Sequence, residues 1–178
     1  MKPPRRPPPP LDASALERLA LRYVERFATT RGRLRQYLER KLRERGWEGE
    51  GAPDPAGLAE RMAGLGYVDD AAYGEARAAA MARRGLGGRR VSEALKHAGI
   101  EERDAEALRP AIDARTIDSA IAYARRRRLG PFAAELPDRP GRERAIAAML
   151  RAGHGFDIAR RIVAMAPGEP LEPLLDRD

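Results

Sequence analysis

The chain has 178 residues, of which 34 are Lys or Arg and 27 are Asp or Glu, so its formal net charge is +7 at pH 7. Aromatic residues make up only 5% of it and Cys is absent, which excludes a large aromatic core, disulfide bonds, thiolate metal sites and a cysteine nucleophile. It contains no apolar stretch typical of a membrane span or a signal peptide. We therefore expect a cytoplasmic protein that binds nucleic acid or an acidic protein surface.

Both ends of the chain are predicted to be tails. Residues 1–12 include six Pro with Lys2, Arg5 and Arg6 among them, a composition that predicts an extended, disordered basic tail. We favour an inert leader over a ligand for a proline-binding domain. Residues 167–178 contain three Pro and several acidic residues and are predicted to be a frayed acidic tail.

The segment after the first tail has the pattern of an amphipathic helix. Ser14 is followed three residues later by Glu17, which is a capping-box pattern. The apolar residues that fall on one face of this helix are Leu16, Leu19, Ala20, Tyr23, Val24 and Phe27. The spacing therefore predicts a first helix that begins at Ser14 and buries this face.

Two more helices follow in the same pattern. Thr29 or Thr30 can cap the second, and Gly46 ends it; its apolar stripe comprises Leu34, Tyr37, Leu38 and Leu42. After a loop rich in Gly and Pro, a third helix ends at Gly66 and carries Leu58, Met62 and Leu65. No segment alternates with period two for long enough to predict a strand.

The three-helix pattern recurs twice more. Each middle helix is marked by a small or capping residue, then two variable positions, then Arg with an apolar residue, and another apolar residue one turn later. The copies are Thr30, Arg33, Leu34 and Leu38; Gly87, Arg90, Val91 and Leu95; and Gly141, Arg144, Ala145 and Met149. This repetition predicts an all-α fold of three tandem three-helix repeats in an elongated array, over residues 13–68, 69–114 and 115–166.

Arginine gathers at a similar place in each repeat. The predicted binding surface comprises Arg33, Arg40, Arg43, Arg83, Arg84, Arg89, Arg90, Arg125, Arg126, Arg127 and Arg128. In the first repeat, three- and four-residue steps connect Arg33, Gln36, Arg40 and Arg43, which places them on a helix face away from the leucine stripe. A single charged run is usually a solvated face. Three clusters in modules that stack in register would instead form a continuous basic track.

No pattern indicates catalysis. His97 and His154 have no neighbouring metal ligand, so a surface or partly buried role is favoured for both. Residues 85–88 are rich in Gly, but no strand precedes them and they lack Gly-Lys-Ser/Thr, which favours a flexible cap over a phosphate cradle. Asp69 and Asp70 could form a metal pair, but a helix N-cap is more ordinary. We expect no enzyme activity, cofactor or metal.

Four segments together carry a family resemblance. Gly66-Tyr67-Val68-Asp69-Asp70 with Tyr73, residues 84–91 with Leu95, Gly99 and Ile100, and residues 21–35 and 127–132 resemble, in order, the motifs of the RecX family of RecA regulators. The resemblance covers Leu16 to about Met165. The chain departs from the family pattern at Gly88, where Pro is common, at Arg33, and in a longer first middle helix.

The resemblance implies a curved array of helical repeats that lodges in the groove of the RecA filament on single-stranded DNA. There it would limit filament extension and lower the ATPase, strand-exchange and co-protease activities, in the regulation of DNA repair and of the SOS response. The expected partners are the RecA filament and the single-stranded DNA within it, with weak direct DNA binding and a monomeric chain. Weak charge contacts would add through multivalency.

A different class of function remains open, a helical protein that binds DNA non-specifically and acts without RecA. Reading of base sequence is disfavoured because the middle helices offer almost only Arg. Stacking on single-stranded bases is disfavoured because most of the aromatic residues fall in apolar stripes. Phosphate binding alone would weaken steeply with salt, whereas filament binding would persist through protein contacts. A purely structural scaffold, the third possibility, predicts no effect on DNA transactions.

Overall fold

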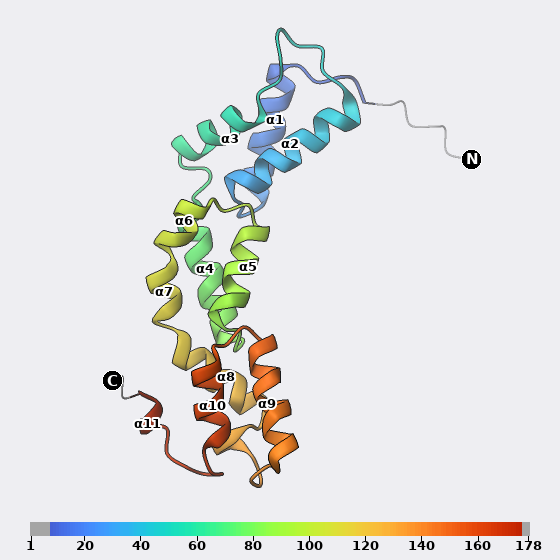
Figure 1. Ribbon diagram of the computed structural model, residues 1–178. Coiled ribbons are helices and arrows are strands. Elements are labelled where there is room, and N and C mark those ends of the chain that lie inside the picture. Colours follow the sequence, from blue (N-terminus) through green and yellow to red (C-terminus); the bar gives the residue numbers. More distant parts are fainter. Residues whose placement is uncertain (1–7, 176–178) are drawn as a thin grey trace, which may run out of the picture. The chain divides into compact units, whose positions relative to one another are not determined.

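The computed structural model describes residues 8–175, and every regular element in this range is a helix (Figure 1). The one β-type pairing found in this range is an isolated bridge between Leu11 and Trp47. The predicted all-α class is therefore confirmed. No helix in the described range is long and apolar enough to cross a bilayer. Lys2, Arg5 and Arg6 of the predicted basic tail lie outside the described residues.

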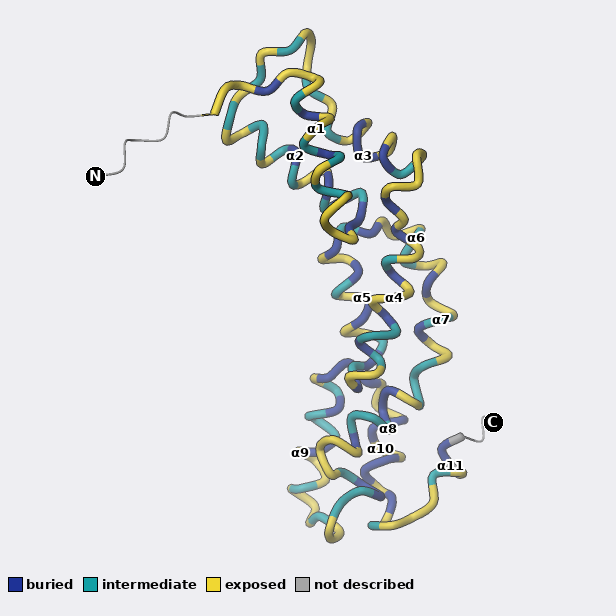
Figure 2. Tube along the Cα trace, turned by 180° about the vertical axis from the view of Figure 1, so that it is seen from behind, coloured by how far each residue is buried: buried dark blue, intermediate teal, exposed yellow. Residues whose placement is uncertain are grey.

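The chain divides into two compact units. Unit 1 runs up to Tyr73 and includes Ala98–Glu101, while unit 2 comprises Gly74–His97 and the chain from Glu102 on. Unit 1 contains α1 (Ala13–Arg26), α2 (Arg31–Arg45), α3 (Pro55–Gly64) and the start of α4 (Asp70–Arg83). Its buried core consists of Leu11, Leu16, Ala20, Leu34, Leu38, Leu58, Ala59, Met62 and Val68. Buried and exposed residues alternate along these helices (Figure 2).

The start of unit 1 differs from the sequence prediction in two ways. Leu11 is fully buried, its N–H donates to the carbonyl of Gly46 at 3.0 Å, and its own carbonyl accepts from Glu48 at 2.9 Å. The predicted tail of residues 1–12 is therefore too long. The predicted cap at Ser14 is also wrong, because the side chain of Asp12 accepts the N–H of Ala15 at 2.7 Å and α1 begins one residue earlier.

Other helix ends follow the expected chemistry. The hydroxyl of Thr30 accepts the N–H of Arg33 at 3.1 Å, which confirms Thr30 as the N-cap of α2. Gly46 ends α2 with a φ of 80°, a left-handed value that glycine adopts without steric cost. The third helix was predicted to end at Gly66 and to carry Leu65, but α3 ends at Gly64, and Leu65 lies just past it and is 63% exposed.

Unit 2 holds the remaining helices. After α4 come α5 (Gly88–His97), α6 (Glu102–Ala107), α7 (Arg109–Asp113), α8 (Thr116–Arg127), the short 3-10 helix η1 (Gly130–Phe132), α9 (Arg139–Arg151), α10 (Phe156–Ala164) and α11 (Glu172–Leu175). Its largest core cluster consists of Ala120, Ala124, Ala145, Met149, Ile158, Ala159, Ile162, Val163, Met165 and Leu174. Pro110 lies in the first turn of α7, where its missing N–H costs no helical hydrogen bond.

Two predictions for unit 2 need correction. The middle helix of the third repeat begins at Arg139 rather than near Gly141, because Asp138 caps it by accepting the N–H of Gly141 at 2.7 Å. The segment after Pro167 is not frayed over the residues described. Leu174 is 2% exposed within the core of unit 2, Leu171 packs against that core, and the N–H of Gly168 donates to the carbonyl of Pro131 at 2.9 Å.

The same type of helix joint occurs in both units. In unit 1 the hydroxyl of Thr30 donates to the carbonyl of Ala98, and Gly32 packs directly on Gly99. In unit 2 the N–H of Gly87 donates to the carbonyl of Ala152 at 2.9 Å. In unit 1 the start of α2 therefore meets Ala98 and Gly99, and in unit 2 the start of α5 meets the C-terminal end of α9. The division into three tandem repeats stays a prediction.

Candidate functional site

The segment from Gly66 to Tyr73, which carries part of the family resemblance, forms a structural joint in unit 1. Asp69 accepts the N–H of Ala72 at 2.8 Å, so its predicted role as an N-cap is confirmed. Asp70 has a different role: its side chain is only 4% exposed and accepts the backbone N–H of Arg31 at 2.9 Å and the Nε of Arg31 at 3.2 Å. These bonds fasten the start of α4 to the start of α2.

Two arginines of α2 are held by this joint. Burial acts to lower the pKa of Arg31, but hydrogen bonds to Glu60 and Asp70 outweigh it, so the pKa of Arg31 is raised above its ordinary value. Arg33 donates from Nη1 to the hydroxyl of Tyr73 at 2.6 Å, and its guanidinium carbon lies 5.5 Å from the centre of that ring. Arg33, a predicted surface residue, is therefore bound within unit 1.

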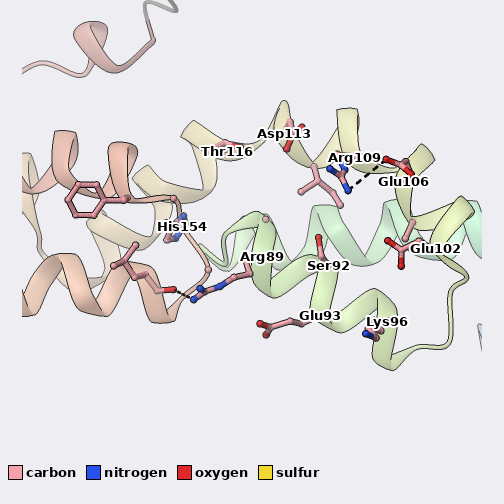
Figure 3. Close-up of a pocket in the computed structure, with 17 residues that line it drawn as sticks. Arg89, Ser92, Glu93, Lys96, Glu102, Glu106, Arg109, Asp113, Thr116 and His154 are labelled. Atoms are coloured by element: carbon pink, nitrogen blue, oxygen red, sulfur yellow. Dashed lines mark hydrogen bonds and ion pairs between the residues drawn. The ribbon is translucent and has the colours of Figure 1, made fainter.

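The second motif, residues 84–91, forms a comparable joint in unit 2. Arg89 donates from Nη2 to the carbonyl of Leu150 at 2.6 Å (Figure 3). Arg90 donates from Nε to the carbonyl of Arg151 at 3.2 Å and pairs with Glu93 at 2.9 Å. Because the last carbonyls of a helix lack partners within it, Arg89 and Arg90 satisfy the C-terminal end of α9.

His154 is buried next to the contact between residues 84–91 and the end of α9. It is 4% exposed, and its Nε2 is 3.0 Å from the carbonyl of Gly85. A carbonyl only accepts, so Nε2 carries the proton and Nδ1, which is buried without a hydrogen-bond partner, carries none. Burial lowers the pKa of His154, and the bond to Gly85 opposes that shift. His97, by contrast, is exposed.

The other predicted arginines fall into two groups. Arg40 pairs with Glu44 at 3.6 Å, and the guanidinium of Arg125 lies 5.2 Å from the ring centre of Phe132. The hydrogen bond from Lys41 is the main reason why the pKa of Glu44 is lowered, with a smaller contribution from the charge of Arg43. Of the predicted arginines, those that are exposed and have no hydrogen bond or ion pair among the described residues are Arg43, Arg83, Arg84, Arg125, Arg126, Arg127 and Arg128.

Three of these unpaired arginines line one hollow in unit 2. Arg126, Arg127 and Arg128, at the end of α8, meet Arg144 of α9 around a space of about 440 Å³. Its other lining residues are Leu129, Gly141, Ala145 and Ala148, so no acidic residue lines it. Arg144 was part of the repeat pattern but not of the predicted surface. Four guanidinium groups without internal partners suit phosphate or carboxylate groups, which arginine binds in two-point geometry.

A larger cleft of about 810 Å³ lies in the same unit between α5, α6, α7 and the α9–α10 connection (Figure 3). Its charged lining residues are Arg89, Glu93, Lys96, Glu102, Glu106, Arg109 and Asp113. Positive and negative side chains alternate in it, and Arg109 lies 3.9 Å from Glu106. The electrostatic potential of the cleft therefore does not have a single sign. Among the residues described, no three His, Asp or Glu side chains are grouped to hold a metal ion.

Comparison with known proteins adds the following. No family model matches the chain. It is 30% identical over 163 residues to a protein of Myxococcus xanthus (strain DK1622) named regulatory protein RecX, across 85% of this chain and 86% of the relative. It is 29% identical over 167 residues to a protein of Agrobacterium fabrum (strain C58 / ATCC 33970) with the same name, across 92% of this chain and 86% of the relative.

A solved structure supports the fold. The crystal structure of RecX from Lactobacillus salivarius matches with a TM-score of 0.65 at 20% identity, across 84% of this chain and 93% of that one. The all-helical fold and the relatives together place the chain among helical regulatory proteins. It belongs to the RecX family, as its motifs predicted.

Proposed function

We propose that this protein regulates the RecA recombinase by binding the RecA filament on single-stranded DNA. It limits filament extension and thereby lowers the ATPase, strand-exchange and co-protease activities of RecA, acting as a monomer in the cytoplasm in the control of DNA repair. Membership of the RecX family is the observation that carries this proposal. The net charge of +7 supports it, because a filament on DNA exposes phosphates and acidic protein surface.

The internal contacts refine which arginines bind the filament. We assign contact roles to the exposed arginines without a hydrogen bond or ion pair among the described residues, namely Arg43, Arg83, Arg84, Arg125, Arg126, Arg127, Arg128 and Arg144, together with Arg40, which pairs only with the exposed Glu44. Arg33, Arg89 and Arg90 instead hold the joints between helices. A guanidinium that already satisfies a backbone carbonyl would have to break that bond to reach a partner, which lowers its gain on binding.

The test is ATP hydrolysis by the cognate RecA on single-stranded DNA, titrated with this protein at moderate salt. Strong inhibition well below one molecule per RecA is the expected result, because a protein that limits filament extension acts on many subunits at once. An unchanged rate at a molar excess, with RecA shown to be bound to the DNA, would refute the proposal.

The second candidate is direct DNA binding without RecA, favoured by the hollow lined by four arginines. The salt dependence of binding distinguishes the two candidate functions. Affinity for naked DNA falls log-linearly with salt concentration as counterions return to the phosphates. Inhibition of RecA is expected to decline less steeply over the same salt range, since protein contacts add to it. Equal slopes for both would favour the second candidate.

A further inference from the structure

Three aromatic rings gather on unit 1 at α1 and α2. The rings of Tyr23 and Tyr37 stack with centres 4.3 Å apart and planes 21° from parallel, and the ring of Phe27 lies 5.3 Å from that of Tyr23 at 49°. Tyr23 and Tyr37 also pack against the core of unit 1. Since aromatic pairs prefer offset or tilted contacts at such distances, the three rings form one connected surface.

Three cations surround these rings. The guanidinium carbon of Arg26 lies 5.8 Å from the centre of Phe27, while that of Arg40 and the Nζ of Lys41 lie 5.6 Å and 5.9 Å from the centre of Tyr37. Among the described residues, Glu44 is the one carboxylate paired with them, at 3.6 Å from Arg40 and 2.5 Å from Lys41. The aromatic–basic patch, defined as these three rings and three cations, therefore keeps a positive charge.

Phe27 is the exposed member of the patch. Its sequence spacing predicted a buried place on the first helix, yet 54% of it is exposed. The reason is local: Phe27 is the C-cap of α1 with φ −136° and ψ 124°, so its backbone has left the helix and its side chain leaves the helical face. Phe27 therefore offers an exposed aromatic ring beside the cation of Arg26, a combination that can contact both a planar group and an anion.

We propose that the aromatic–basic patch binds single-stranded nucleic acid, stacking a base on Phe27 and holding adjacent phosphates with Arg26, Arg40 and Lys41. A planar base fits a partly exposed ring, and every base has a face that can stack. Bases of a duplex are already stacked on one another and are closed to such a contact. An acidic peptide would use the cations but would leave the ring in water. The sequence disfavours stacking because most of the aromatic residues fall in apolar stripes, but the ring of Phe27 is exposed.

The biological setting of this contact rests on the proposed function, which places the protein on filament-covered DNA, but the contact itself is measured on naked DNA. Two labelled oligonucleotides of equal length are used, one of thymidine residues and one of abasic residues with the same phosphate charge. The wild-type chain is expected to bind the thymidine oligonucleotide more tightly. Phe27→Ala is expected to weaken that binding about tenfold and to leave binding of the abasic oligonucleotide unchanged.

Tyr67→Ala is the matched control, because Tyr67 is 53% exposed in the same unit but lies outside the patch. It should bind both oligonucleotides as the wild type does. Circular dichroism checks that Phe27→Ala keeps its helices, as expected for a residue outside the core. Equal weakening on both oligonucleotides, or no weakening on either, would overturn the stacking contact. Inhibition of RecA is measured in a separate assay. The oligonucleotide binding result can therefore be interpreted even if the protein does not inhibit RecA.

Discussion

Asp69 and Asp70 are neighbours in the sequence but stabilise the protein in different ways. Asp69 is exposed and accepts one N–H at the start of α4. Asp70 is buried and accepts both the backbone N–H and the Nε of Arg31. Removing an exposed cap returns the freed N–H to water, whereas removing the buried carboxylate takes one acceptor from both the backbone N–H and the Nε of Arg31.

Substitution of Asp69 and of Asp70 should lower the stability of the protein by different amounts. Asp70→Ala is expected to lower the free energy of unfolding by about 3 kcal/mol, because it breaks a buried charge pair. Asp69→Ala should cost about 1 kcal/mol, the usual value for a lost N-cap. Urea unfolding followed by circular dichroism measures both. Equal losses for the two variants would show that the contact of Asp70 with Arg31 adds nothing beyond capping.

His154 is expected to make the stability of the protein depend on pH. Its pKa is lowered by burial, so an unfolded chain takes up a proton near the ordinary pKa of about 6.5 while the folded chain does not. The contribution is fully present above that value and is lost as pH falls below it. The slope is at most ~1.4 kcal/mol per pH unit. Protonated Nδ1 would also be a buried donor, and it has no acceptor among the described residues.

The free energy of unfolding should therefore decrease between pH 7.5 and pH 5.5 in the wild type. In His154→Gln, whose amide can still donate to the carbonyl of Gly85, the decrease should be smaller. His97→Gln is the control, because His97 is exposed and its removal should leave the decrease as in the wild type. A pH dependence that is the same in all three proteins would exclude His154 as its source.

At the scale of single residues, the sequence predicts which helix face a side chain lies on better than it predicts the group that the side chain binds. The spacing of Arg33 placed it on an outer helix face, yet its guanidinium is bound to Tyr73, which lies 40 positions later in the chain. Arg89 similarly binds the carbonyl of Leu150, 61 positions later. Such contacts depend on how helices pack, which the helical period does not encode. The helical period therefore predicted which helix face carries the arginines. It could not distinguish arginines that stay exposed from arginines that bind a neighbouring helix.

At the level of elements, helices were predicted more reliably than their ends. Thr30 and Gly46 mark the bounds of α2 as expected, because hydroxyl caps and left-handed glycines act locally. Asp12 displaced Ser14 as the cap of α1, since both residues carry suitable side chains and only the fold decides between them. Leu171 and Leu174 were predicted to lie in a tail because Pro and acidic residues surround them, but they pack on the core of unit 2.

The contact of Gly32 with Gly99 offers a test of the joint in unit 1. A Cβ at Gly32 would lie 2.7 Å from the Cα of Gly99, closer than real contacts allow. Because backbone cannot yield as a flexible side chain can, Gly32→Ala is expected to lower the free energy of unfolding by roughly 1–3 kcal/mol. Thermal unfolding of purified variants provides the measurement.

Gly64→Ala is the matched control for this joint. Gly64 also lies in a helix, but a Cβ there would meet nothing within 4 Å. Alanine has the better helix propensity, so this variant should be neutral or more stable by up to about 1 kcal/mol. If Gly32→Ala proved as stable as Gly64→Ala, close approach of the two backbones would not be required for the joint.

Taken as a whole molecule, the chain uses its arginines for two purposes. Some bind internal groups, as Arg89 and Arg90 do in unit 2. Others, such as Arg126 and Arg127, stay exposed without internal partners. Charge that is not neutralised internally gives the molecule its long-range field and its electrostatic attraction to DNA. Loss of arginines from the second group should therefore affect binding far more than stability.

The double variant Arg126→Ala with Arg127→Ala tests this division. If each arginine contacts one phosphate, the slope of log affinity for single-stranded DNA against log salt should become shallower by about 1.4. RecA inhibition should weaken in parallel, while the melting temperature stays close to that of the wild type. Titrations of labelled DNA at several salt concentrations measure the slope.

The control removes the same charge from the same unit. Arg109 and Arg139 are exposed and pair with Glu106 at 3.9 Å and Glu143 at 3.1 Å. Exposed pairs of this kind contribute at most about 1 kcal/mol, so Arg109→Ala with Arg139→Ala should fold normally. Because each of these arginines already faces a carboxylate, the salt slope should stay near the wild-type value. Equal changes in the two double variants would mean that net charge alone, and not the hollow between α8 and α9, determines DNA binding.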